Sequence, residues 1–204
     1  MKPKPQDAFA RLPGLTLVKR AMEVAAAGGH SITIVDCNGY STQYQYAFEE
    51  LATIRSGVVD HTLLPRLTVL SPCPCGNLTH PERACICSSA RIRQYQNTGK
   101  LRRAMGADIV VDASYIRARD FDTTHNEGAD VVLGRIGTMT DARPTLTPDA
   151  AQLLDRAYSS LHMNAADRDR AARVAVTIAG LDHSETVEAR HIAEAIQYRS
   201  RASI

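Results

Sequence analysis

Four of the five cysteines in the chain lie close together, as two Cys-X-Cys pairs. The first pair is Cys73 and Cys75, and the second is Cys85 and Cys87. A Cys-X-Cys pair brings two thiolates close enough to share one metal ion, and two such pairs can complete a closed tetrahedral site with four sulfurs. Such a site has no open coordination position for catalysis. The spacing therefore predicts a structural zinc ion.

Other interpretations of these cysteines stay open at this point. His80 lies in the polar turn between the two pairs and could replace one sulfur as a ligand. Free buried thiols or a disulfide would also account for clustered cysteines. Cys37 is remote from the others along the chain, and we expect it to be a small core residue.

The second stretch whose residues could carry chemistry is the turn after the β-branched run at residues 31–35. A P-loop at this place needs two glycines, a lysine that reaches the outer phosphates and a hydroxyl for the magnesium ion. The residues at these positions are Asp36 and Ser41 for the glycines, Thr42 for the lysine and Gln43 for the hydroxyl. Because an aspartate would repel phosphate, we expect an ordinary strand-to-helix turn and no ATP.

A basic cluster follows the cysteines. Its members are Arg91, Arg93, Lys100, Arg102 and Arg103. These side chains could contact several phosphates of a nucleic acid, and each contact would add a salt-sensitive increment to the affinity. The alternative is a solvated face that pairs with acidic neighbours. The sequence favours neither.

Composition limits the classes of function. A formal net charge of +2 is too small to imply a polyanionic partner for the whole molecule, so DNA binding would depend on local clustering. The absence of Trp and an aromatic content of 5% argue against a platform for base stacking. No run approaches the roughly 20 apolar residues of a membrane span. We therefore expect a cytoplasmic protein without membrane contact, a compartment in which clustered cysteines are more often metal ligands than disulfides.

Helix and strand patterns alternate in the first part of the chain and predict an α/β fold. We expect a flexible arm at residues 1–14 and an α/β core at residues 15–143, which includes a cysteine insert at residues 72–88. The expected elements of the core are helices at residues 17–27, 46–54 and 88–96 and strands at residues 31–35, 66–70 and 108–113.

Residues 144–204 are rich in helix formers and predict a helical bundle. Thr147-Pro148 and Asn164 have the residue types preferred at helix starts. The expected helices of this second domain are at residues 148–161, 165–179 and 185–197.

Three separated pieces of the chain resemble the Mg-chelatase-like AAA+ ATPases of the ComM type. The pieces are the helix that ends in Gly28-Gly29-His30, the segment Pro72-Cys73-Pro74-Cys75-Gly76 with Cys85 and Cys87, and the terminal His191-Ile192-Ala193-Glu194-Ala195-Ile196-Gln197-Tyr198-Arg199. The resemblance implies a reduced AAA+-like core with a zinc-binding insert and a helical lid. It also implies a degenerate nucleotide site made of Gly28, Gly29, His30, Asp36, Gly39 and Thr42.

The departures from that family fall on the residues that would perform ATP chemistry. The P-loop lysine and the Walker B carboxylates are not found, the segment before the cysteines is shortened, and the lid arginines align with Ala166 and Val176. We therefore expect a catalytically inactive relative that acts as a zinc-stabilised binding or assembly module. Its expected partners are further copies or another protein, with DNA as a candidate. The alternatives are an ATP-binding or DNA-translocating subunit with atypical motifs and a DNA-binding zinc protein.

Overall fold

The computed structural model describes residues 7–56, 66–122, 126–140 and 145–199. The first part of the described chain contains α1 (Thr16–Gly28), β1 (Ile32–Val35), α2 (Ser41–Ser56), β2 (Leu67–Leu70), α3 (Ser89–Gln96), α4 (Gly99–Met105) and β3 (Ile109–Asp112). The second part contains α5 (Ala129–Gly137), β4 (Thr145–Leu146), α6 (Pro148–Ser160), α7 (Ala165–Leu181), β5 (Thr186–Val187) and α8 (Ala189–Gln197). A short 3-10 helix, Ala118–Phe121, lies between β3 and α5.

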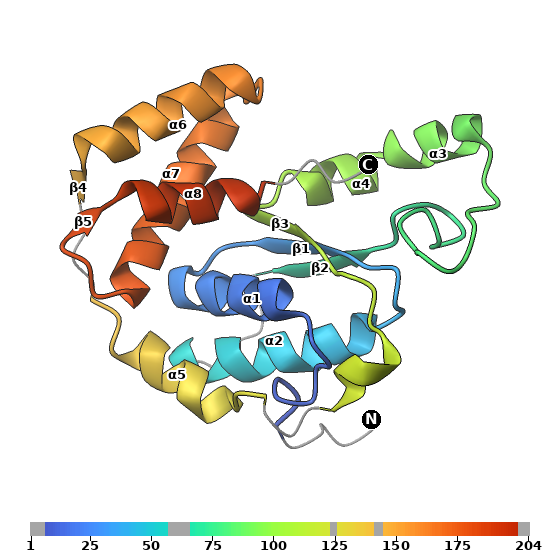
Figure 1. The fold of residues 1–204 in the computed structure, drawn as a ribbon, viewed down its shortest axis with the longest axis horizontal. Helices are drawn as coiled ribbons and strands as arrows, with labels where there is room; N and C mark the ends of the chain where they lie inside the picture. Colours follow the sequence, from blue (N-terminus) through green and yellow to red (C-terminus); the bar gives the residue numbers. More distant parts are fainter. Residues whose placement is uncertain (1–6, 57–65, 123–125, 141–144, 200–204) are drawn as a thin grey trace.

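The core is a parallel sheet with the strand order β2-β1-β3 (Figure 1). Thr33 in β1 is in register with Thr68 in β2 and Val110 in β3. Side chains alternate between the two faces of a strand, and residues in register on neighbouring strands point to the same face. The sheet therefore has one face marked by Thr33 and Thr68, and an opposite face marked by Ile32 and Ile34.

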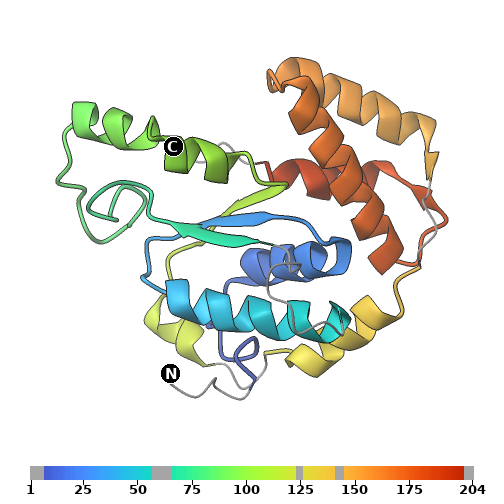
Figure 2. The same ribbon diagram turned by 180° about the vertical axis from the view of Figure 1, so that it is seen from behind.

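The two faces are covered unequally (Figures 1 and 2). Helices α1 and α2 lie against one face, where Ile32 and Ile34 are buried in the main hydrophobic core. On the other face, α4 lies over β1, and the Thr33 hydroxyl donates to the carbonyl of Ala104 at 2.7 Å. Parallel sheets are usually covered by helices on both faces. Here the second face has only a seven-residue helix above it in the part of the chain that the structure describes.

The C-terminal helices α6, α7 and α8 pack together as a bundle, which we call the lid (residues 145–199), and their buried side chains are continuous with the main core. Thr147 and Asn164 cap α6 and α7 as their residue types predict, since each side chain accepts a backbone N–H of the first turn. The lid packs at the amino ends of the strands (Figure 1). The N–H of Val110 donates to the carbonyl of Tyr198 at 2.7 Å, so the lid is joined directly to β3.

The expectation of a flexible N-terminal arm is wrong for residues 7–14. Phe9 and Leu12 are buried in the main core, and the Phe9 N–H donates to the carboxylate of Glu50 at 3.1 Å. Residues 1–6 lie outside the described part of the chain. Two helices were not expected from the sequence, α4 and α5, and α2 begins at Ser41, before its expected start.

The predicted α/β fold is confirmed, with its short parallel sheet, its cysteine-rich segment and its C-terminal helical domain. Across the described residues, every helix is too short or too polar to pass through a lipid bilayer.

Candidate metal centre beside an altered phosphate loop

The four clustered cysteines come together beyond the carboxyl end of β2. Their sulfur atoms all lie within 4.8 Å of one another. The Cys73 sulfur is 3.4 Å from that of Cys75 and 3.6 Å from that of Cys85, and the Cys75 and Cys85 sulfurs are also 3.6 Å apart. A tetrahedral zinc ion with Zn–S bonds of about 2.3 Å separates its sulfurs by about 3.8 Å. The cluster therefore fits a metal ion held by four sulfurs.

Local backbone geometry brings the cysteines together. Gly76 has a φ of +81°, and its N–H donates to the carbonyl of Cys73 at 3.0 Å. Only glycine adopts this conformation without strain, so it permits the tight turn that follows the first pair. On the far side of the insert, the Tyr95 hydroxyl of α3 donates to the carbonyl of Ser71 at 3.2 Å. The insert is thus held at its start and at its end.

One thiol is already favoured as a thiolate. Backbone N–H groups of Asn77 and Ile86 lower the pKa of Cys75 to about 6. Metal-binding cysteines must be deprotonated, so Cys75 is the ligand that needs the least proton release at neutral pH, whereas the pKa of Cys85 and that of Cys87 are raised beside it.

His80 has a different role in the structure. Its Nδ1 accepts the N–H groups of Glu82 and Arg83, each at 3.1 Å, and its ring lies 4.5 Å from the ring of Tyr115. Among the described residues, the metal-binding group consists of the four cysteines without His80. Cys37 is half-buried in the loop after β1 and does not belong to this group.

Asp36 accepts the hydrogen bonds of the loop after β1. Its carboxylate receives the N–H of Asn38 and the N–H of Tyr40, each at 2.9 Å, and the hydroxyl of buried Tyr44 at 3.1 Å. Burial, followed by the charge of Asp36, raises the pKa of Tyr44, so the phenol remains a donor. In a P-loop, backbone N–H groups at this place cradle phosphate. Here the protein's own carboxylate takes N–H groups of the loop.

The altered loop and the cysteine insert face each other across a shallow cleft of about 440 Å³. The loop contributes Asp36 and Gly39, and the insert contributes Cys75, Gly76 and Arg83. The predicted metal site therefore lies beside the position where the fold would hold phosphate. The neighbourhood of Arg83 could not be read from the sequence, because it depends on how the insert folds back.

The six residues predicted for a degenerate nucleotide site are divided between two places. Asp36, Gly39 and Thr42 lie at the carboxyl end of β1, with Thr42 exposed on the first turn of α2. The segment Gly28-Gly29-His30 lies at the amino end of β1, about 13 Å away for a strand of four residues. The structure does not bring the two groups together.

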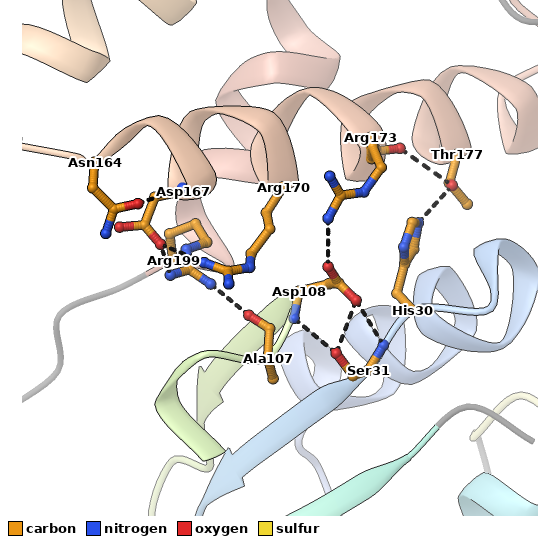
Figure 3. Close-up of polar contacts among 10 residues, drawn as sticks. All are labelled: His30, Ser31, Ala107, Asp108, Asn164, Asp167, Arg170, Arg173, Thr177 and Arg199. Atoms are coloured by element: carbon orange, nitrogen blue, oxygen red, sulfur yellow. Dashed lines mark hydrogen bonds and ion pairs between the residues drawn. The ribbon is translucent and has the colours of Figure 1, made fainter. Parts of the chain in front are cut away.

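His30 instead joins the core to the lid (Figure 3). Its Nε2 lies 2.7 Å from the hydroxyl of Thr177 on α7, and both residues are buried. Beside it, the Asp108 carboxylate accepts the N–H of Ser31 at 3.1 Å, its hydroxyl at 2.8 Å and the guanidinium of Arg173 at 2.9 Å. Although burial raises it, hydrogen bonds from Ser31 and Arg173 lower the pKa of Asp108.

The last residue of the lid completes this interface. Arg199 donates to the carbonyl of Ala107 at 2.6 Å and forms an ion pair with Asp167, which also pairs with Arg170 at 3.1 Å (Figure 3). Arg170 thus belongs to the polar network between lid and core.

The comparisons with known proteins identify this C-terminal part of the chain. Residues 108–199 match the family model for magnesium chelatase, subunit ChlI C-terminal. The match covers less than half of the chain, and it shows that the C-terminal part is similar to the C-terminal part of that subunit. The matched segment begins at the Asp108 carboxylate and ends at Arg199, and these two ends lie together at the interface of core and lid. A search of curated proteins finds no match.

All five members of the basic cluster are exposed. None of its five members forms an ion pair within the described residues, so the acidic neighbours that would neutralise them are not found there. Arg102 donates to the side-chain oxygen of Asn97 at 3.1 Å. The cluster is split by the fold, because Arg91 and Arg93 are on α3 and the other three cations are on α4. Arg66, which the sequence did not single out, lies near the α4 cations.

Proposed function

We propose that this chain is a magnesium-chelatase-like, metal-stabilised binding module that does not hydrolyse ATP. The observation that supports the proposal is the carboxylate of Asp36, which accepts the N–H groups of Asn38 and Tyr40 at 2.9 Å. A bound phosphate would need those donors and would also meet a negative charge at the same place. The position of the P-loop lysine is taken by Thr42, which supplies no compensating charge.

The metal has a structural role in this proposal, with zinc as the expected ion. Cys73, Cys75, Cys85 and Cys87 would hold it. A tetrahedral ion with four sulfur ligands has no position left for water or substrate, so it would stabilise the insert without taking part in a reaction. The insert has few buried apolar residues of its own, since only Pro72 and Cys73 are buried within it. A small loop of this kind requires a cross-link to stay folded.

The experiment is a measurement of ATP turnover by the purified, zinc-loaded protein in the presence of magnesium. We expect no hydrolysis above the buffer rate, and no change in Asp36→Ala. ATP turnover that Asp36→Ala abolishes would overturn the proposal. Native mass spectrometry of the same sample tests the assembly role, for which we expect more than one chain, or a chain with a co-purified protein, and one metal ion per chain.

Nucleic acid is the second candidate, because the basic cluster is exposed and has no ion pair within the described residues. Each phosphate contact contributes about one unit to the slope of log affinity against log salt. We expect DNA affinity to fall with salt and to be weakened by Arg91→Glu with Arg93→Glu. Unchanged affinity and salt slope in that variant would exclude this candidate.

A further inference from the structure

The geometry points to a phosphate-binding cleft on the face of the sheet that α1 and α2 leave uncovered. This cleft has a volume of about 480 Å³ and lies between α4 and the strands β1 and β2. It is distinct from the place of a P-loop, which is at the carboxyl end of β1. We call it the anion cleft and define it by Arg66, Lys100 and Arg103 with the hydroxyl residues Thr33 and Thr68.

The anion cleft begins with the alternation of the strands. Thr33 and Thr68 are in register, so both point away from the apolar face that carries Ile32 and Ile34. The Thr33 hydroxyl is used by the carbonyl of Ala104. Thr33 is also buried, so of these two residues it is the half-buried Thr68 that offers a hydroxyl at the floor of the cleft.

Positive charge comes from two separate elements. Lys100 and Arg103 are three residues apart on α4, a spacing that places them on one side of a helix, and both line the cleft. Arg66 enters from the start of β2. Arg102 is rotated away from them by the helical period and bonds to Asn97 instead. The fold thus selects two members of the basic cluster and adds a third cation that is distant in sequence.

Among the described residues, no acidic side chain lines the cleft. The nearest carboxylate in sequence, Asp108, is engaged by Ser31 and by Arg173. None of the three cleft cations forms an ion pair within the described residues. Three cations around a concave polar floor create a positive potential that attracts an anion.

The chemistry favours a phosphate group over a carboxylate. A single guanidinium can satisfy both oxygens of a carboxylate, whereas two guanidinium groups and one ammonium together offer enough charge and N–H donors for the three acceptor oxygens and higher negative charge of a phosphate group. The volume lies within the range of small-molecule sites. The phosphate could belong to a phosphorylated small molecule or to the 5′ end of a nucleic acid strand.

The test uses isothermal titration of the full zinc-loaded chain with inorganic pyrophosphate, in a buffer without magnesium. The cleft variant combines Arg66→Gln, Lys100→Gln and Arg103→Gln. The matched control combines Arg91→Gln, Arg93→Gln and Arg102→Gln, so that the change in net charge is the same. We expect binding to the native chain, a weakening of tenfold or more in the cleft variant, and a change below about threefold in the control. Thermal unfolding and metal content verify that all three proteins are folded and loaded.

Two results would overturn the anion cleft: no pyrophosphate binding at millimolar concentration, or equal weakening in both variants. Competition against bound pyrophosphate then distinguishes a nucleic acid end from a phosphorylated small molecule. Displacement by a 5′-phosphorylated oligonucleotide, and not by the unphosphorylated strand, supports a nucleic acid end, whereas displacement by neither supports a small molecule. Anion binding in this cleft does not depend on whether the altered loop after β1 supports ATP hydrolysis. ATP phosphates could occupy the cleft without hydrolysis, which is why turnover, and not binding, tests the altered loop.

Discussion

Arg173 on α7 donates to the carboxylate of Asp108, 2.9 Å away at the start of β3. The same carboxylate accepts two hydrogen bonds from Ser31 at the start of β1. One side chain therefore ties together two strands and the lid. The position of the lid depends in part on the charge of this group.

We predict that Asp108→Asn weakens folding at neutral pH and makes stability less sensitive to acid. The pKa of Asp108 is lowered in the folded state, so its contribution is fully present above the unfolded value of about 3.9 and is lost as the pH falls through the folded value. We expect a loss of about 1–2 kcal/mol at pH 7 and a much smaller difference at pH 3, measured by urea unfolding. Asp155→Asn, which breaks the exposed pair with Arg168, serves as control and should change stability by less than about 0.5 kcal/mol. Equal losses at both pH values would contradict the prediction.

We predict one zinc ion per chain, lost when the cysteine cluster is disrupted. Replacing Cys75 by Ser removes one of the four sulfur ligands, and the metal content should fall well below one ion per chain. Cys37→Ser is the matched control, because Cys37 lies outside the cluster. Elemental analysis and thermal unfolding with and without chelator provide the measurements. A full metal content in Cys75→Ser would show that the four sulfurs do not form the site.

The bond between Tyr44 and Asp36 provides a prediction about the altered loop. Tyr44→Phe removes one donor at 3.1 Å, and we expect a loss of about 1 kcal/mol. Asp36→Ala leaves a buried phenol and two N–H groups without their acceptor, and we expect the free energy of unfolding to fall by about 2–3 kcal/mol. Asp169→Ala on the exposed side of α7 should be close to neutral. Denaturant titration measures all three variants, and a neutral Asp36→Ala would mean that the carboxylate does not organise the loop.

Two adjacent glycines should respond differently to alanine. A Cβ on Gly28 would overlap the imidazole of His30 and stand 2.5 Å from the Thr177 hydroxyl. A Cβ on Gly29 would meet nothing within 4 Å, although the residue has a φ of +68°. We expect Gly28→Ala to lower the free energy of unfolding by about 2–3 kcal/mol, because the added methyl disturbs the contact of core and lid. We expect Gly29→Ala to lower it by about 1–2 kcal/mol from backbone strain alone. Hydrogen exchange of α7 should rise only in the first variant, and a rise in both would refute the distinction.

Local signals predicted the elements that depend on neighbouring residues. The glycine stop of α1, the caps at Thr147 and Asn164, and the convergence of the cysteines all follow from spacing along the chain. These features form because their partners lie close along the chain, within one turn for the caps and within one short insert for the cysteines.

The features that the sequence did not predict depend on distant partners. Helix α5 contains Gly134 and Gly137, which weaken its helical signal, but Val132 and Ile136 are buried in the main core. Phe9 becomes part of the core because the segment before α1 lies against α2, where the Phe9 N–H donates to the carboxylate of Glu50. The role of Arg66 requires the register of β1 with β2 and the position of α4, which no local pattern contains.

The carboxylate of Asp36 also determines how the loop after β1 can respond to its surroundings. A ligand that binds only the folded state stabilises it in proportion to the logarithm of its concentration. A tethered acceptor has a fixed effective concentration and cannot diffuse away. The order of this loop should therefore be the same at every ATP concentration, as a permanent state and not as one position of a switch.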